Sequence, residues 1–134
     1  MPIKKQDTIR ARLIRIENAK NEAKVQVDEK GQSAVTHYSV LRIFSKNSEF
    51  SLLECRIETG RTHQIRVHMA YIGHPVLADR AYGDKSINSF LKRDLGIGRQ
   101  LLHAYSLVFI HPKTLKKITI EAPYPKDFLQ IMAS

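Results

Sequence analysis

Alternation of apolar and polar positions predicts a β-hairpin in the middle of the chain. Residues 34–44 are rich in β-branched and aromatic types, and residues 50–57 alternate between apolar and charged side chains. A polar turn at Lys46 to Ser48 separates the two runs, as in an antiparallel hairpin. Leu53 and Cys55 are expected to share one face of the second strand.

A helix is predicted next, from His63 to Ile72. Thr62 is expected to cap its first turn through the side-chain hydroxyl, and Gly73 and Pro75 are expected to end it. Apolar residues fall on two nearly opposite sides of the helical wheel, which indicates a helix packed between two layers. They are Ile65, Met69 and Ile72 on one side and Val67, Ala70 and Tyr71 on the other.

The flanking segments complete an α+β pattern. Residues 101–110 are apolar on both faces, which favours a central strand, whereas residues 116–121 alternate like an edge strand. Further elements are expected at Arg10 to Ile16 (strand), Lys24 to Val27 (strand), Ser86 to Leu95 (helix) and Asp127 to Met132 (helical turn). Together, these elements predict a mostly antiparallel sheet with one buried helix and long loops.

Arg66 occupies an unusual place on the predicted helix. It falls between Met69 and Ala70 on the wheel, and the helix offers no broad polar face. A guanidinium there is largely desolvated and keeps its proton, which costs several kcal/mol unless hydrogen bonds and a partner offset it. We therefore expect Arg66 to bind a carboxylate or a phosphate, or to reach the surface along its own stem.

Composition and charge narrow the class of partner. The 134 residues, 43% hydrophobic and 26% charged, fit one globular domain. The sequence has 22 Lys and Arg residues and 13 Asp and Glu residues, so the net charge is +9. The expected partner is therefore nucleic acid, ahead of an anionic membrane surface. The single cysteine, Cys55, excludes an intramolecular disulfide and fits a cytoplasmic protein. No apolar run approaches the roughly 20 residues of a membrane span.

Arginines and histidines are interleaved around the predicted helix. Such a cluster near a helix N-terminus suits phosphate, although it also fits a solvated face. His63 and His68 are five positions apart and do not share a helical face, so we expect no metal ion. The sequence contains no nucleophile elbow and no glycine-rich phosphate loop. The cluster comprises Arg56, Arg61, Arg66, Arg80, His63, His68 and His74.

Two stretches of the sequence are distinctive. One runs from Leu53 to Met69 and contains Gly60-Arg61-Thr62-His63-Gln64-Ile65-Arg66-Val67-His68. The other is Gly73-His74-Pro75-Val76-Leu77-Ala78-Asp79, followed by Tyr82-Gly83. With Gly31 to Tyr38, Leu101 to Ala104 and His111-Pro112, they closely resemble the RluA/RluC-type RNA pseudouridine synthases, nearest to those of large-subunit rRNA. The resemblance extends from about residue 3 to the C-terminus.

The resemblance implies an isomerase that converts uridine to pseudouridine in RNA without a metal or an organic cofactor. In this family the target base is flipped into a pocket, and an aspartate acts on the nucleoside. The uracil then detaches, rotates and rejoins through carbon. By resemblance, Arg66 pairs with that aspartate and Ile65 forms part of the pocket wall. Contacts with large-subunit rRNA are expected from Arg61, Thr62, His63, Gln64 and Arg80.

One part of the family pattern is absent. The family's catalytic aspartate lies in an upstream His-Arg-Leu-Asp motif, and none of the six aspartates in this sequence follows Arg-Leu. We interpret residues 1–134 as the C-terminal half of a catalytic domain, without the upstream part that carries the aspartate or any small S4-like domain. The isolated chain is then expected to be inactive, and its uncovered apolar face to favour a non-native dimer.

Two other interpretations stay open. A non-catalytic basic RNA-binding module would account for the charge. A small ribosome-associated structural protein would also account for the charge, but it gives no reason for Arg66.

Overall fold

The chain forms an α+β fold, as the sequence predicts. The computed structural model describes residues 3–17, 23–44, 50–104, 106–110, 113 and 117–133. In chain order the elements are β1 (Gln6–Ile9), β2 (Leu13–Glu17), β3 (Ala23–Val27), β4 (Thr36–Phe44), β5 (Phe50–Ile57), α1 (Gln64–Tyr71), α2 (Lys85–Leu95), β6 (Ser106–Ile110), β7 (Lys117–Glu121) and α3 (Lys126–Ala133).

The predicted central hairpin is confirmed as β4 and β5. The two strands pair antiparallel from Thr36 opposite Ile57 to Phe44 opposite Phe50, with a bulge after Val40. The strand β1 adds to the other side of β4, which gives a sheet in the order β1-β4-β5. The predicted turn at 46–48 lies outside the described residues.

A second hairpin, β2 and β3, confirms the two short strands expected near the N-terminus. These strands pair from Leu13 opposite Val27 to Glu17 opposite Ala23. The first strand begins at Leu13 and not at Arg10, because residues 10–12 form the connection from β1, which ends at Ile9 and pairs with β4.

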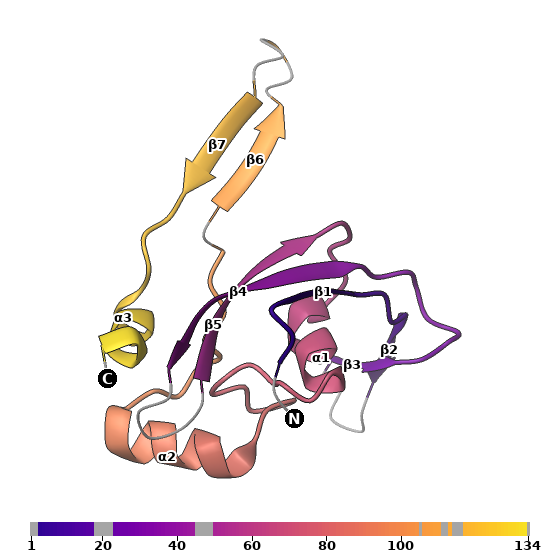
Figure 1. The fold of residues 1–134 in the computed structure, drawn as a ribbon. Helices are drawn as coiled ribbons and strands as arrows, with labels where there is room; N and C mark the ends of the chain where they lie inside the picture. Colours follow the sequence, from indigo (N-terminus) through magenta and orange to yellow (C-terminus); the bar gives the residue numbers. More distant parts are fainter. Residues whose placement is uncertain are drawn as a thin grey trace.

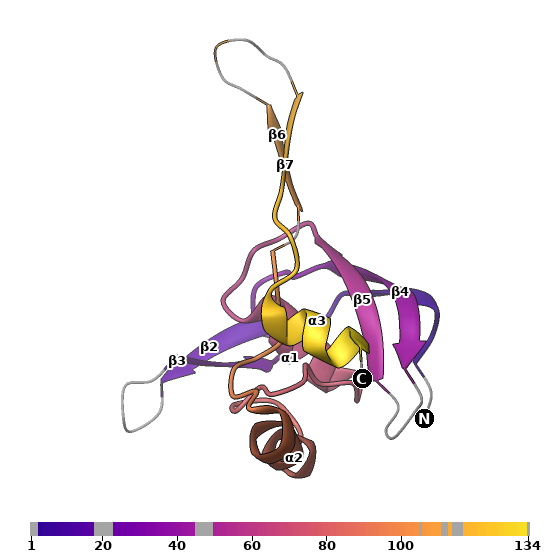
Figure 2. The ribbon, with the colours of Figure 1, turned by 90° about the vertical axis from the view of Figure 1, so that its left-hand side faces the viewer.

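The helix α1 lies between the two sheets, as its two apolar sides predict (Figures 1 and 2). On one side Val67 packs with Leu13 and Val25 of the β2–β3 hairpin. On the other side Met69 packs with Tyr38 of the larger sheet. Tyr71, the last residue of the helix, departs from the prediction, since it is 61% exposed.

The ends of α1 are formed differently from one another. The predicted cap at Thr62 is wrong: the cap position is His63, which adopts a left-handed conformation (φ 54°) and makes no side-chain capping bond. The predicted C-terminal end is confirmed, since Gly73 has φ 86° and the N–H of His74 returns to the carbonyl of Met69 at 2.9 Å. A positive φ of this kind suits glycine, which lacks a Cβ.

The helices α2 and α3 close a third apolar cluster. Leu91, Ile97 and Ile131 are buried together there. Asp84 caps α2 by accepting a hydrogen bond from the N–H of Ile87 at 3.0 Å. The helices expected at Ser86 to Leu95 and Asp127 to Met132 are therefore both present, extended by one residue or more.

The expected central strand at 101–110 is wrong. The strand β6 begins at Ser106 and pairs with β7 in a two-stranded sheet that extends away from the body (Figure 1). The first part of the apolar run is irregular and packs in the body instead, where Leu101 donates a hydrogen bond to the carbonyl of Leu77 at 3.0 Å. Apolar composition alone does not separate these two outcomes. The sequence also predicts turns at Asn18 to Asn21 and at His111 to Thr114, and of these residues the structure describes only Lys113.

A buried polar chain fixes α1 to its surroundings. The Nε2 of His68 lies 2.8 Å from the carbonyl oxygen of Ala11, and its Nδ1 lies 2.8 Å from the hydroxyl of Thr36. Because a carbonyl oxygen accepts, Nε2 carries the proton and Nδ1 of the neutral ring accepts from Thr36. Gln64 donates in turn to Thr36 Oγ1 at 3.0 Å. His68, Thr36 and Gln64 are all buried.

We expect this chain to make the protein acid-sensitive. Burial lowers the pKa of His68, and the bond to Ala11 opposes that shift only in part. The unfolded chain therefore takes up the proton more readily, so stability should be constant above the ordinary histidine pKa of about 6.5 and fall below it. Urea unfolding from pH 8 to pH 5 measures this, with His68→Gln as the control that removes the dependence on this site. A flat profile in the wild type would contradict the assignment.

A second prediction concerns Gly31, which lies against β2. A Cβ there would come within 2.4 Å of the carbonyl carbon and oxygen of Leu13, which are backbone atoms. Gly31→Ala should therefore lower the free energy of unfolding by about 2–3 kcal/mol. Gly60→Ala is the matched control, since a methyl group at Gly60 would meet nothing within 4 Å. It should change stability by less than about 1 kcal/mol.

Candidate functional site

The centre of the candidate site is an ion pair between α1 and the loop that precedes α2. The Nε of Arg66 lies 2.7 Å from Oδ2 of Asp79, and its Nη2 lies 2.9 Å from Oδ1. The Asp79 side chain is fully buried and that of Arg66 is 14% exposed. A planar bidentate contact of this kind holds the guanidinium in a single orientation.

The loop holds Asp79 from several directions. Its Oδ1 also accepts the backbone N–H groups of Ala81 and Tyr82, at 3.0 and 3.1 Å. Asn88 of α2 donates to the carbonyl of Asp79 at 2.8 Å and accepts from the N–H of Ala78 at 2.8 Å. Ala78 has φ 62°, a left-handed conformation that costs energy for a residue with a Cβ. The Asn88 side chain thus stabilises the turn that delivers Asp79.

Tyr82 joins this pair to His63. The guanidinium carbon of Arg66 lies 5.2 Å from the centre of the Tyr82 ring, within the range of a cation–π contact. The Tyr82 hydroxyl accepts the N–H of Val25 at 3.0 Å and lies 2.9 Å from Nδ1 of His63. Side chains at the start of α1 and on the Asp79 loop therefore form one connected network, which also includes the backbone of β3.

The charges in this network reinforce the paired state. Burial alone would raise the pKa of Asp79, but hydrogen bonds from Arg66, Tyr82 and Ala81 outweigh it and hold the pKa below its usual value. The hydrogen bond to Asp79 raises the pKa of Arg66. Burial and the nearby Arg66 lower the pKa of His63. The pair is thus ionised at neutral pH, beside a neutral imidazole.

Arg66 keeps donors that Asp79 does not use. A guanidinium has five N–H donors, and the bidentate contact occupies one on Nε and one on Nη2. The edge formed by Nη1 and Nη2 therefore remains available for a second carboxylate or a phosphate. Of the alternatives for Arg66, the structure shows a carboxylate partner within the chain.

The side chain of Gln64 stabilises the fold and does not face a ligand. Its amide nitrogen donates to the carbonyl of Val35 at 2.9 Å, and its oxygen accepts from Thr59 Oγ1 at 2.7 Å and from the N–H of Arg61 at 3.1 Å. The residue is 3% exposed. Its polar atoms tie the turn before α1 to β4, and they hold the start of the helix in the way that was expected of Thr62. We therefore leave Gln64 out of the proposed RNA surface.

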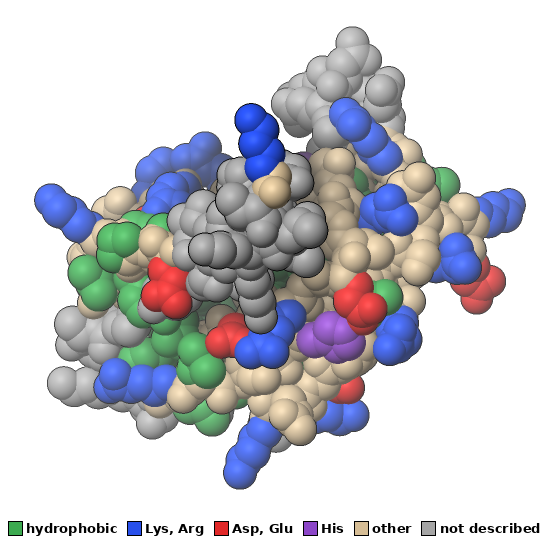
Figure 3. Space-filling view, turned by 90° about the horizontal axis from the view of Figure 1, so that it is seen from above, with side chains coloured by type: hydrophobic (Ala, Val, Ile, Leu, Met, Phe, Trp, Pro, Cys, Tyr) green, Lys and Arg blue, Asp and Glu red, His purple; other side chains and the backbone are tan. Residues whose placement is uncertain are grey.

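The other expected RNA contacts lie on the surface near the start of α1 or on the Asp79 loop. Arg61 and Thr62 are exposed, His63 is half-buried, and Arg80 is exposed next to Asp79. Lys and Arg side chains are spread over the face shown in Figure 3, where they outnumber the acidic groups. The residues suggested for RNA, apart from Gln64, are thus accessible to a ligand.

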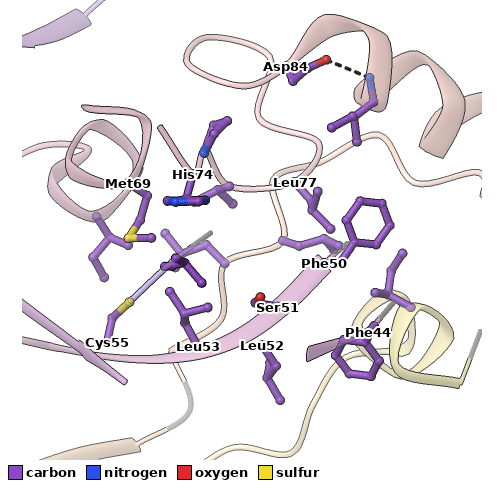
Figure 4. A pocket seen from close by; sticks show the side chains of 18 of the residues that line it. Phe44, Phe50, Ser51, Leu52, Leu53, Cys55, Met69, His74, Leu77 and Asp84 are labelled. Carbon is purple, nitrogen blue, oxygen red and sulfur yellow. Dashed lines mark hydrogen bonds between the residues drawn. The ribbon is translucent and has the colours of Figure 1, made fainter. Parts of the chain in front are cut away.

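Ile65 lines a separate, apolar cavity of about 370 Å³. Its walls come from β5, α1, the following loop, α2 and α3, and Figure 4 shows Phe50, Leu53, Met69 and Leu77 facing one another across it. Arg66 and Asp79 are not among its lining residues. Burial raises the pKa of Cys55, which also lines the cavity, to about 11, so this thiol stays protonated.

The described residues hold no group of three or more His, Cys, Asp or Glu side chains placed to bind a metal ion. In the same residues, every helix is too short or too polar to span a bilayer.

Comparison with known proteins decides the family. The sequence pattern of the RNA pseudouridylate synthases matches residues 1–71, which end with α1 and include Arg66. The chain belongs to the RNA pseudouridylate synthase family. The resemblance noted from the sequence is confirmed.

Relatives among the pseudouridine synthases are similar over most of this chain. Ribosomal large subunit pseudouridine synthase C of Buchnera aphidicola is 38% identical over 120 residues, 90% of this chain and 37% of that protein. Ribosomal large subunit pseudouridine synthase D of Zymomonas mobilis is 48% identical over 101 residues, 75% of this chain and 31% of that protein. The chain thus spans about a third of the length of these relatives.

The fold agrees with that of a solved family member. The structure of human RNA pseudouridylate synthase domain containing 1 has a TM-score of 0.72 and 26% identity, over 93% of this chain and 51% of that one. The α+β arrangement is therefore that of part of a pseudouridine synthase domain.

Sequence reasoning missed two members of the network, Asp79 and Tyr82. Asp79 does not follow Arg-Leu, and nothing in the sequence pattern links it to Arg66. A signal was present, since both residues lie in the second distinctive stretch. The sequence does not indicate the path of the loop between α1 and α2, which brings Asp79 back to the helix.

We expect Asp79→Asn to destabilise the protein strongly. The substitution leaves Arg66 facing a neutral amide at a buried position, and loss of one partner of such a pair costs about 3–5 kcal/mol. Because Arg66 retains some exposure, the lower end of that range is expected in urea unfolding. Asp94→Asn, which breaks the exposed pair of Arg93 and Asp94, is the matched control and should have little effect. Equal losses in the two variants would contradict the role given to Asp79.

Proposed function

We propose that this chain forms the arginine-bearing part of the active site of an enzyme that isomerises uridine to pseudouridine in RNA. Large-subunit rRNA is the substrate class, as the names of the relatives suggest. The free donor edge of Arg66 carries the proposal, on an arginine that lies within the family's sequence pattern and is oriented by Asp79.

The catalytic aspartate comes from the part of the domain upstream of this sequence. It would meet the Nη1–Nη2 edge of Arg66, which can bind a carboxylate with two parallel hydrogen bonds. Asp79 is unsuited to act on the nucleoside itself, because its carboxylate is buried and already accepts four hydrogen bonds. The role of Arg66 is then to orient the acting carboxylate and to keep it ionised.

The RNA would approach over the start of α1. Arg61, Thr62, His63 and Arg80 offer exposed or half-exposed donors there. Flipping a base from its stack costs a few kcal/mol, and contacts to the RNA backbone can supply that energy. No metal or organic cofactor enters this proposal, and the reaction is placed in the cytoplasm.

The apolar cavity is the proposed contact with the upstream half of the domain. Its lining suits apolar side chains better than phosphates, and the chain spans about a third of the length of its relatives. The strand β5 borders the cavity and lies at the edge of its sheet in the described chain, so it can also accept a further strand. In the absence of the upstream half, a second copy would be expected to cover this face.

A non-catalytic RNA-binding module is the second candidate. The net charge of +9 favours it, as does the commitment of Asp79 to Arg66. Both candidates bind RNA, so product formation separates them.

The test is complementation with an upstream half that carries His-Arg-Leu-Asp. Purified chain is incubated with unmodified rRNA, alone and with the separately expressed upstream half, and pseudouridine is measured by chemical mapping. Product is expected in the mixture and not with the chain alone. Arg66→Ala should abolish product with a modest loss of RNA affinity, because the acting carboxylate loses its partner.

Two controls make the result interpretable. Arg93→Ala removes an exposed arginine on α2, which is paired with Asp94, and should leave product formation unchanged. Product with the chain alone would mean that the acting carboxylate lies within these 134 residues. Unchanged activity in Arg66→Ala would remove the ion-pairing role from the proposal.

A further inference from the structure

Two exposed arginines that lie far apart in the sequence are held on one short segment. Arg12, between β1 and β2, donates from Nη1 to the carbonyl of Gly31 at 3.1 Å. Arg61, just before α1, donates from Nε to the carbonyl of Ser33 at 2.9 Å. We call these two residues the arginine pair. The sequence indicated Arg61 but offered no reason to connect Arg12 with it.

Both guanidiniums are held by carbonyls of the same short segment. Gln32, between the two carbonyls, exchanges two hydrogen bonds with Leu13, at 3.0 and 2.8 Å, which attaches the segment to β2. Gly31 and Ser33 are two residues apart, so their carbonyl groups lie at most about 7 Å apart along the chain. The arginine pair therefore has one guanidinium at each of two closely spaced carbonyls.

The pair keeps its full positive charge. A backbone carbonyl is neutral, and each arginine gives it only one of five N–H donors. Three other exposed arginines of the described chain, in contrast, are neutralised by carboxylates. These are Arg56 with Glu54, Arg93 with Asp94 and Arg99 with Asp127. No ion pair to a described carboxylate occurs at Arg12 or Arg61.

The segment that carries the pair packs closely on β2 and adjoins the candidate site. Gly31 approaches the backbone of Leu13 so closely that a Cβ would not fit. The N–H of Arg61 donates to Gln64 in the first turn of α1, the helix that also carries Arg66. An anion held by the pair would therefore lie beside the start of α1, at a fixed position relative to Arg66.

We propose that the arginine pair binds neighbouring phosphates of the RNA strand, one at each guanidinium. The inference rests on the proposed function for its ligand, RNA, and adds Arg12 and a defined register on the backbone. Guanidinium groups bind phosphate with two parallel hydrogen bonds, and the carbonyl contacts reduce the freedom that each side chain loses on binding. Such contacts position the strand without selecting its sequence.

The test is the salt dependence of RNA binding by this chain. A short fluorescein-labelled single-stranded RNA is titrated by fluorescence anisotropy between about 50 and 200 mM salt. Arg12→Gln and Arg61→Gln should each reduce the slope of log affinity against log salt by about 0.7, and the double variant by about twice that. Arg12→Lys and Arg61→Lys should keep the slope, because a point charge still contacts phosphate.

Arg93→Gln and Arg99→Gln are the matched controls. Each removes the same charge from an exposed arginine that already has a carboxylate partner, so the slope should not change. Circular dichroism checks that all variants are folded. Slopes in Arg12→Gln and Arg61→Gln equal to those of the controls would overturn the proposal, as would the absence of RNA binding.

An acidic peptide is the competing ligand. If poly-glutamate displaces the RNA as well as unlabelled RNA does, the pair binds acidic groups in general and the proposal is overturned. This experiment measures RNA affinity, whereas the complementation experiment measures pseudouridine. Unchanged salt slopes in the arginine variants would therefore overturn the arginine pair and not the proposed isomerase. A lack of product in complementation would overturn the proposed isomerase, and the salt slopes could still be compared.

Discussion

The ion pair of Arg66 and Asp79 is the interaction on which the site depends. It joins a helix to a loop that follows it, and it fixes the direction of a guanidinium that the helix alone would leave without a partner. A buried pair of this kind is tolerated because every oxygen of Asp79 is hydrogen-bonded, to Arg66 and to the N–H groups of Ala81 and Tyr82. The cost of burying the charges is thereby offset within the chain.

The surrounding fold acts mainly to hold the two ends of this pair. On the Arg66 side, α1 is packed between two sheets, and His68 links it to Thr36 and Ala11. On the Asp79 side, Asn88 of α2 stabilises the loop. The apolar clusters thus support a polar network that spans three elements, which is why a change in the loop is expected to affect stability as well as function.

The sequence was sufficient for the local elements and insufficient for their long-range arrangement. Periodicity predicted the β4–β5 hairpin, α1 with its two apolar sides, and α2. It failed for the run 101–110, whose first residues pack beside Leu77 while the rest forms a separate hairpin, since both fates suit apolar residues. In the site, helical geometry indicated that Arg66 needs a partner. The identity of Asp79 depended on the course of a loop. The placement of Arg12 and Arg61 on one segment depended on the isolated bridge between Leu13 and Gln32.

Because Asp79 balances the charge of Arg66, the two residues together form an electrically neutral unit. A lone guanidinium would stabilise an approaching carboxylate by full charge attraction and make it a weaker base. A guanidinium that shares its charge with Asp79 still offers two directed donors on its free edge, but with a smaller net field. An anion that meets this edge would thus be aligned, while its pKa would fall less than it would beside an unpaired arginine. Asp79, which lies on the other edge of the guanidinium, would in this way set how strongly Arg66 acts on whatever it binds.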